Sequence, residues 1–153
     1  MGGDITIQQE RLADCLEEFI ALIPYHYDEV CIFDKTKTKL KPDWSVYFEM
    51  EITGRFFMMT CRKDGKMIGY YTSFLVPHTH YKDRIVSQSD TIFIKKEYRK
   101  GLIGLKLIRL AEEKLREIGV NIITLRVKTD GRLHRLMDRL EYKPFDTTYF
   151  KEI

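Results

Sequence analysis

The residues whose types and spacing suit chemistry gather in one stretch, between Ser89 and Gly104. A run rich in branched residues leads into the basic turn Arg99-Lys100-Gly101, and a helical pattern starts directly after it. Such a turn points unpaired backbone N–H groups and the positive end of a helix dipole at one place, where a phosphate can bind. Gly101 and Gly104 would let the backbone approach the anion closely, and the two cations would add charge. The alternative is a helix-start glycine beside a solvated turn.

Asp90, which precedes this turn, is the best candidate for a general base. The segment around it is predicted to be a strand, and alternation along a strand predicts that Asp90, Ile92 and Ile94 share one face. An amine with a pKa near ~10.4 must lose a proton before it attacks a carbonyl carbon, and a carboxylate can accept that proton. A solvated or hairpin-capping aspartate is the alternative.

His78 and His80 form a second candidate group, because both lie on one face if their segment is extended. Imidazoles titrate near physiological pH, so the pair could contact a substrate or relay a proton. A pair of surface-loop histidines is the alternative. No third ligand is predicted near them, and no Cys/His cluster has zinc-like spacing, so no metal site is expected.

Composition and charge exclude several classes of protein. A length of 153 residues fits one domain, and a net charge of +3 is too small for a nucleic-acid binder. The patterns GxxxxGK[ST] and GxGxxG are absent, so neither a nucleoside triphosphate nor a dinucleotide is expected. No apolar run approaches the ~20 residues of a membrane helix. Gly2 and Thr6 match the myristoylation pattern, but no polybasic segment follows, so we expect a coincidence. Three scattered cysteines suggest reduced thiols and a cytoplasmic protein.

The elements that must position these residues follow from hydrophobic periodicity. Helices are predicted from Leu12 to about Pro24, from Pro42-Asp43 to about Gly54, over 103–118 and over 133–140. Strands are predicted over 56–61, 67–76, 87–94 and 122–127, with one or two more within 142–150. Asp64-Gly65 is a hairpin signal between the first two strands. The expected fold class is α/β of the mixed α+β kind, a mixed, mostly antiparallel sheet with helices on both faces.

With these elements around it, the segment from Glu97 to Ile108 resembles the signature of the GNAT acetyltransferases. In that superfamily the loop between the fourth strand and the third helix reads [QR]-x-x-G-x-[GA]. Arg99 fills the first position and Gly104 the last, whereas Leu102 stands where the first glycine belongs and Gly101 comes one place early. The chain most resembles GNAT proteins encoded by tailed bacteriophages, through Pro42-Asp43-Trp44, the segment 76–81 and the run 139–144.

The resemblance implies a fold, an activity and a set of site residues. The activity is transfer of an acetyl group from acetyl-CoA to an amine, with the cofactor's pyrophosphate on the loop. Backbone N–H groups near Phe93 and Ile94 would stabilise the oxyanion. Many members use a tyrosine as general acid, but the alignment puts Met137 at that position, so Tyr149 on the predicted last strand is the hypothesis for the acid. The implied cofactor-binding residues are Phe93, Ile94, Arg99, Lys100, Gly101, Leu102, Ile103, Gly104 and Asp130.

Three functional hypotheses follow. The first is an acetyl-CoA-dependent N-acetyltransferase acting on an unidentified amine, in the host cytoplasm if a phage encodes the chain. The second is a non-catalytic GNAT-fold module that acts through a protein partner, which the Leu102 departure favours. The third, an acetyltransferase acting on charged transfer RNA, would need a stronger basic face than +3 provides. The oligomeric state is left open, a homodimer included.

Overall fold

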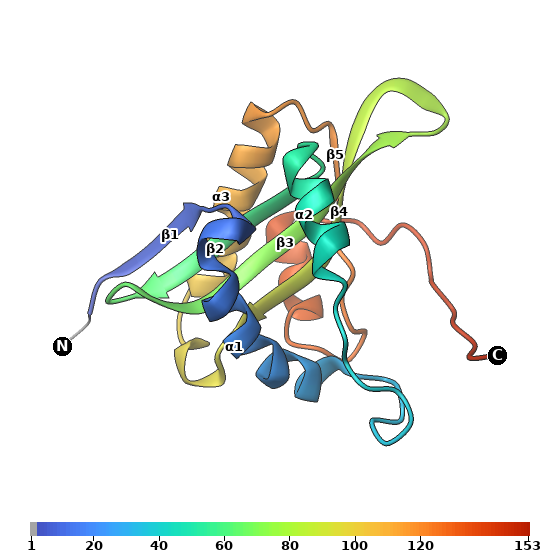
Figure 1. The fold of residues 1–153 in the computed structure, drawn as a ribbon. Coiled ribbons are helices and arrows are strands. Elements are labelled where there is room, and N and C mark those ends of the chain that lie inside the picture. The colour runs from blue at the N-terminus through green and yellow to red at the C-terminus, as the bar shows by residue number, and fades with distance from the viewer. Residues whose placement is uncertain (1–2) are drawn as a thin grey trace.

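The computed structural model describes residues 3–153, so Gly2 of the myristoylation pattern lies outside the described part. One five-stranded sheet, in the order β1-β2-β3-β4-β5, forms the centre of the fold (Figure 1). Neighbouring strands are antiparallel except β4 and β5, which are parallel. The mixed, mostly antiparallel sheet is therefore confirmed. Its strands are β1 (Ile5–Gln9), β2 (Phe56–Lys63), β3 (Lys66–His78), β4 (Tyr81–Ile94) and β5 (Ile122–Thr124).

Helices cover both faces of the sheet (Figure 1). Helices α1 (Leu12–Val30) and α2 (Trp44–Ile52) pack on one face, and α3 (Ile103–Glu117) packs on the other. Alternation along β2 divides its apolar run between the two cores, Phe56 and Met58 facing α1 and Phe57 and Met59 facing α3. A central strand of this kind is buried on both sides, which explains why its sequence is continuously apolar.

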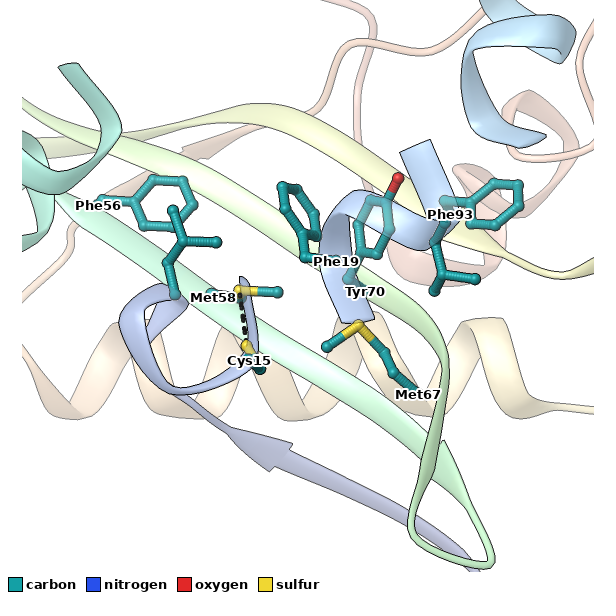
Figure 2. Packing of buried hydrophobic residues seen from close by; sticks show 9 residues of the cluster. Cys15, Phe19, Phe56, Met58, Met67, Tyr70 and Phe93 are labelled. Carbon is teal, nitrogen blue, oxygen red and sulfur yellow. Dashed lines mark hydrogen bonds between the residues drawn. The ribbon is translucent and has the colours of Figure 1, made fainter. Parts of the chain in front are cut away.

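The core under α1 is built around Tyr70, which is fully buried (Figure 2). Its ring lies between those of Phe19 and Phe93, with centroid distances of 4.6 and 5.7 Å. Cys15 and Met58 fill the neighbouring space through a sulfur–sulfur contact of 3.9 Å. This cluster holds the middle of β3 and the end of β4 against α1.

Local turn and cap chemistry behaves as the sequence predicts. Asp64 and Gly65 both adopt positive φ, 49° and 79°, which is the geometry of a two-residue hairpin turn. The carboxylate of Asp43 accepts hydrogen bonds from the backbone N–H groups of Ser45 and Val46, at 3.1 and 3.4 Å, and so caps the start of α2.

Three predicted boundaries are wrong, and one strand was not predicted. Strand β5 ends at Thr124 rather than at Val127, because its pairing with β4 stops at Gln88↔Thr124. Helix α1 continues through Pro24 to Val30, because residues beyond the proline have partners, among them His26, which stacks on Phe93. Strand β4 begins at Tyr81 rather than Ser87, since it pairs with β3 up to a tight turn, and this hairpin extends beyond the rest of the sheet (Figure 1). Strand β1 was not predicted, because its Ile-Thr-Ile alternation is short.

The C-terminal third differs most from the expectation. Residues 133–140 form two short 3₁₀ turns, His134–Leu136 and Asp138–Leu140, instead of one helix. The predicted last strand within 142–150 is absent, and this segment leads away from the sheet (Figure 1). Strand propensity is realised only where side chains pack on neighbours, and Phe145 and Tyr149 remain about nine-tenths exposed.

Candidate functional site

The turn between β4 and α3 presents an open helix N-terminus. A 3₁₀ turn, Lys96–Tyr98, follows β4, and Gly101 adopts a φ of +70°. Leu102 is the N-cap of α3 and makes no side-chain capping hydrogen bond, and the first turn of the helix carries no acidic residue. The N–H groups at the start of this 15-residue helix are thus uncapped by the N-cap side chain, as an anion site requires.

The backbone explains why Leu102 can replace the family's glycine. The positive φ of this turn falls on Gly101, whereas Leu102 has a φ of −108°, which any residue adopts. The side chain of Leu102 is half exposed. At Gly104 an added Cβ would meet only the δ-methyl of Ile94, at 3.8 Å, so space is open there.

Arg99 anchors the turn instead of standing free. Its guanidinium donates hydrogen bonds to the carbonyl of Ile94 and to the carboxylate of Glu29, the latter at 2.8 Å, and lies 5.4 Å from the centre of the Phe93 ring. Lys100 is exposed. The two predicted cations therefore differ in kind: Arg99 ties the turn to α1, and Lys100 is the one accessible to an anion.

Strands β4 and β5 part in the middle of the sheet. Their pairing runs only from Val86↔Ile122 to Gln88↔Thr124, and one further contact joins the N–H of Arg126 to the hydroxyl of Ser89 at 2.8 Å. Within residues 3–153 no strand pairs with the following part of this edge of β4. The separation leaves an open edge between Asp90 and the turn before α3.

Alternation decides which N–H groups point to the open edge. The N–H of Lys95 bonds to the carbonyl of Ile68 on β3, so the N–H of Phe93, two residues earlier, also faces β3. The N–H groups of Ile92 and Ile94 therefore face the edge that β5 leaves open. The N–H of Ile94 thus points where an oxyanion donor was expected, whereas the N–H of Phe93 points to β3 and its side chain packs under α1. The donor role of Ile94 stays a prediction.

A β-bulge places Asp90. Thr72 pairs with Thr91 and Ser73 pairs with Ser89, so Asp90 is the extra residue of β4. A bulge interrupts alternation and re-aims a side chain. Asp90 consequently faces α2, whereas Ile92 and Ile94 face α3. The prediction that these three side chains share one face is wrong for this reason.

Two hydroxyl groups hold the carboxylate of Asp90. The Oη of Tyr47, on α2, donates to Oδ2 at 2.9 Å, and the Oγ1 of the buried Thr72 lies 3.4 Å from the same oxygen. The side chain reaches solvent on one side while protein surrounds the rest. This burial raises the pKa of the carboxyl, although the hydrogen bonds from Tyr47 and Thr72 and the charge of Arg126 oppose the shift. An accessible carboxylate with a raised pKa suits a general base.

The two candidate histidines lie far from Asp90. His78 precedes the tip of the β3–β4 hairpin, where its Nδ1 accepts a hydrogen bond from the N–H of His80 at 3.1 Å. At ~3.3 Å per residue, β3 spans about 20 Å between His78 and Thr72, which adjoins Asp90. The hairpin does not bring His78 or His80 to the carboxylate.

Neither of the remaining predicted residues, Tyr149 and Asp130, makes a hydrogen bond to Asp90 within residues 3–153. Tyr149 is 89% exposed on the C-terminal segment and has no hydrogen-bond partner within residues 3–153, so its predicted placement on a last strand is wrong. Asp130 is exposed in a turn. Tyr142, which follows the second 3₁₀ turn, donates a hydrogen bond to Glu112 on α3 at 2.8 Å.

Sequence reasoning missed the residues that hold Asp90. Tyr47 reads as part of the apolar face of α2, and Thr72 reads as one polar residue within a buried strand. Both meet Asp90 only through pairing of segments distant in the chain, and no local pattern signals this. Among residues 3–153, no group of three His, Cys, Asp or Glu side chains is placed to bind a metal ion. In the same range, none of the helices has the length and apolarity needed to span a bilayer.

Comparison with known proteins agrees with this geometry. Residues 23–142 match the model of the "Acetyltransferase (GNAT) family". No protein of curated function has a significantly similar sequence.

Several solved structures have the same fold. An aminoglycoside acetyltransferase from an uncultured soil metagenomic sample superposes with a TM-score of 0.77 at 14% identity, over 98% of this chain and 99% of that chain. Ribosomal-protein-alanine N-acetyltransferase from Brucella melitensis biovar Abortus 2308 gives 0.69 at 17% identity, over 98% and 99%. The enzyme AAC(6')-Iy, in complex with a bisubstrate analogue containing CoA, gives 0.73 at 13% identity, over 98% of both chains. At these identities the likeness concerns the fold. The family match covers most of the sequence, and the chain belongs to the GNAT family of acetyltransferases.

Proposed function

We propose that this protein transfers an acetyl group from acetyl-CoA to a primary amine, with Asp90 as the general base. The observation that carries the proposal is that one strand, β4, bears an accessible carboxylate at a bulge and leads, through the turn 95–102, to an uncapped helix N-terminus. At ~3.3 Å per residue, Asp90 and Ile94 are about 13 Å apart along the strand. A base and an anion site thus lie along the same open edge.

The residues of the turn fit the cofactor's pyrophosphate. The N–H groups of Ile103 and Gly104 at the start of α3 would bind the phosphate oxygens, with Lys100 adding charge. Gly101 supplies the positive φ that the turn needs, and Gly104 leaves room for close approach. When bound, the cofactor supplies an acetyl thioester. The N–H of Ile94, with that of Ile92, is oriented to hold the thioester oxygen at the open edge of β4.

Asp90 acts on the incoming amine. Its carboxylate accepts a proton from the ammonium group, and the freed nitrogen then forms the C–N bond with the acetyl carbon as the C–S bond breaks. The acylated nitrogen releases its second proton to solvent, which leaves the neutral amide. The leaving thiolate takes its proton from solvent, because Tyr149 is exposed on a segment that forms no strand. A thiol pKa near ~8.5 makes the thiolate a tolerable leaving group without a dedicated acid.

The acceptor is proposed only as a primary amine of a protein or a small molecule. Similar structures include enzymes named for aminoglycosides and for a ribosomal-protein alanine, both of which are amines. The same proposal includes a resemblance to phage-encoded members of the family. It also includes a cytoplasmic location, in the host cell if a phage encodes the chain.

Replacing Asp90 tests the base. Asp90→Asn keeps the shape but cannot accept the proton, so we expect kcat/KM for acetyl-CoA and a reactive amine to fall about 10²–10⁴-fold at neutral pH. The loss should shrink at high pH, where the amine deprotonates by itself. Asp83→Asn, an exposed aspartate on the β3–β4 hairpin, is the matched control.

Wild-type activity of Asp90→Asn at neutral pH would remove Asp90 from the mechanism. Binding of CoA without turnover of any amine in a broad panel would instead favour the non-catalytic module.

A further inference from the structure

The ring of Tyr47 is fixed in place by aromatic neighbours. Its centroid lies 5.6 Å from that of Trp44, 5.5 Å from that of Phe56 and 5.7 Å from that of Phe74. These contacts come from α2, β2 and β3, so three elements determine where the ring points. The hydroxyl is thereby directed at Asp90 independently of the hydrogen bond that it makes there.

The hydrogen bonds to Asp90 fall on one of its two oxygens. Tyr47 Oη and Thr72 Oγ1 both contact Oδ2, at 2.9 and 3.4 Å. Thr72 is itself held, since its Oγ1 accepts from the N–H of Thr91 at 3.1 Å. Within residues 3–153, no group makes a hydrogen bond to Oδ1. One oxygen is therefore anchored, and the other is free to accept a proton.

We propose that Tyr47 is a positioning residue for acetyl transfer, whose hydroxyl holds Oδ2 of Asp90 so that Oδ1 faces the attacking amine. The inference rests on the proposed function, because it assigns a role relative to the base. A carboxylate at a bulge can rotate about its side-chain torsions, and an anchored one loses less conformational freedom when the amine arrives. Tyr47 acts through Asp90 and does not itself touch the amine.

The charged and titratable groups facing Asp90 come from three directions. Tyr47 faces it from α2, Tyr70 from β3 and Arg126 from the segment after β5. Burial raises the pKa of the carboxyl, and the Tyr47 hydrogen bond opposes this. Burial and the nearby Asp90 also raise the pKa of Tyr47 itself, so its hydroxyl stays protonated and remains a donor. Losing the hydroxyl should therefore raise the pKa of Asp90 further.

The test is Tyr47→Phe, which keeps the ring and its three aromatic contacts. We expect kcat/KM to fall about tenfold at neutral pH, since a hydrogen bond to a charged group is typically worth at least that factor. The acid limb of the pH–rate profile should also move upward with the pKa of the base. The loss should remain on the plateau above it, because ionisation of Asp90 does not restore its orientation. Tyr81→Phe removes an exposed hydroxyl from the β3–β4 hairpin and should change neither quantity.

A second measurement separates this inference from the proposed function. The carboxyl carbon of Asp90 is titrated by NMR in the free protein, which needs neither cofactor nor amine. An upward shift in Tyr47→Phe together with the altered rate profile supports the positioning role. An unchanged titration, or a plateau rate equal to the parent's, overturns it. If Asp90→Asn is fully active, the base assignment fails and the positioning role fails with it, whereas the titration still reports whether the contact exists.

Discussion

His26 connects α1 to the end of the sheet from which the turn 95–102 leads to α3. Its Nδ1 lies 3.0 Å from the hydroxyl of Tyr70, and its ring stacks on Phe93 with centroids 5.0 Å apart. Burial lowers the pKa of this imidazole to about 4, with Glu29 opposing the shift and Arg99 adding to it. The folded protein therefore keeps His26 neutral at a pH where an unfolded chain would protonate it.

This difference predicts a pH dependence of stability. Because the unfolded chain binds the proton first, the stabilisation is complete above a pH of about 6.5 and is lost progressively as the pH falls toward 4. His26→Gln can still bond to Tyr70 but does not titrate, so its free energy of unfolding should fall by about 2 kcal/mol less over that window. Denaturant unfolding at several pH values measures this, with the exposed His134→Gln as control. Parallel curves for the parent and His26→Gln would contradict the prediction.

Sequence reasoning identified Asp90 as the candidate base from its position before the turn. It could not identify the face on which Asp90 lies, because the bulge arises from the register of β3 against β4 and not from any local pattern. For the same reason Tyr47 escaped notice: residues 47 and 90 are joined only by the tertiary fold. The position of this carboxylate before the turn was visible in the sequence, whereas its hydrogen-bond partners were not. Its role as a base stays a prediction.

Among the elements, the N-terminus of α3 makes the most direct prediction about the cofactor. Gly104 is the second residue of the helix, where a carboxylate is favourable to the helix dipole, so Gly104→Asp should fold. Its charge would nonetheless stand among the N–H groups that bind phosphate. We expect calorimetry to show CoA affinity reduced well over tenfold.

Gly104→Asn separates charge from size in this experiment. The amide has nearly the shape of the carboxylate, and an added Cβ meets only Ile94 at ordinary contact distance. Its loss of affinity should be clearly smaller than that of Gly104→Asp. Unchanged CoA affinity in a folded Gly104→Asp would show that the pyrophosphate binds elsewhere.

Elements were predictable where the signal is local and strong. The turn at 64–65, the cap at Asp43 and the long amphipathic pattern of α3 each specify their structure through neighbouring residues. The end of α1 was not predictable, because the packing of His26 outweighed the tendency of Pro24 to end the helix. The start of β4 was not either, since residues 81–84 are polar and exposed and show no apolar alternation.

At the scale of the whole molecule, ion pairs join the N-terminal elements into one unit. Arg62 on β2 bonds to Glu10, which follows β1, and to Glu18 on α1, both at 2.8 Å. Burial of Glu10 would raise its pKa, but the hydrogen bonds from Arg62 and Thr60 outweigh that effect and the pKa is lowered. Glu51 on α2 in turn accepts from the N–H groups at the start of α1. These contacts hold β1, β2, α1 and α2 together.

The C-terminal segment has few contacts of this kind, and this predicts what its removal does. Phe145 and Tyr149 are 90% and 89% exposed, while Phe150 is 64% exposed and meets Phe33 with ring centroids 6.2 Å apart. Partial burial of one aromatic ring is worth about 1 kcal/mol at most. A chain that ends after residue 143 keeps Tyr142 and its hydrogen bond to Glu112. Its Tm should therefore lie within about 2–4 °C of the parent's, and its kcat/KM should be unchanged because Tyr149 has no part in the proposed chemistry.

Thermal unfolding of the two chains at several protein concentrations, together with sedimentation, checks this expectation. A second copy of the chain could cover the exposed aromatic side chains of this segment. A homodimer held in this way would give a different result from the one expected for a monomer. In that case the full-length chain would sediment as a dimer, its Tm would rise with concentration, and truncation would abolish both effects. A large loss of Tm at every concentration, with both chains monomeric, would instead mean that residues 144–153 pack on their own sheet in solution. A small, concentration-independent change is the outcome that the burial of these side chains predicts.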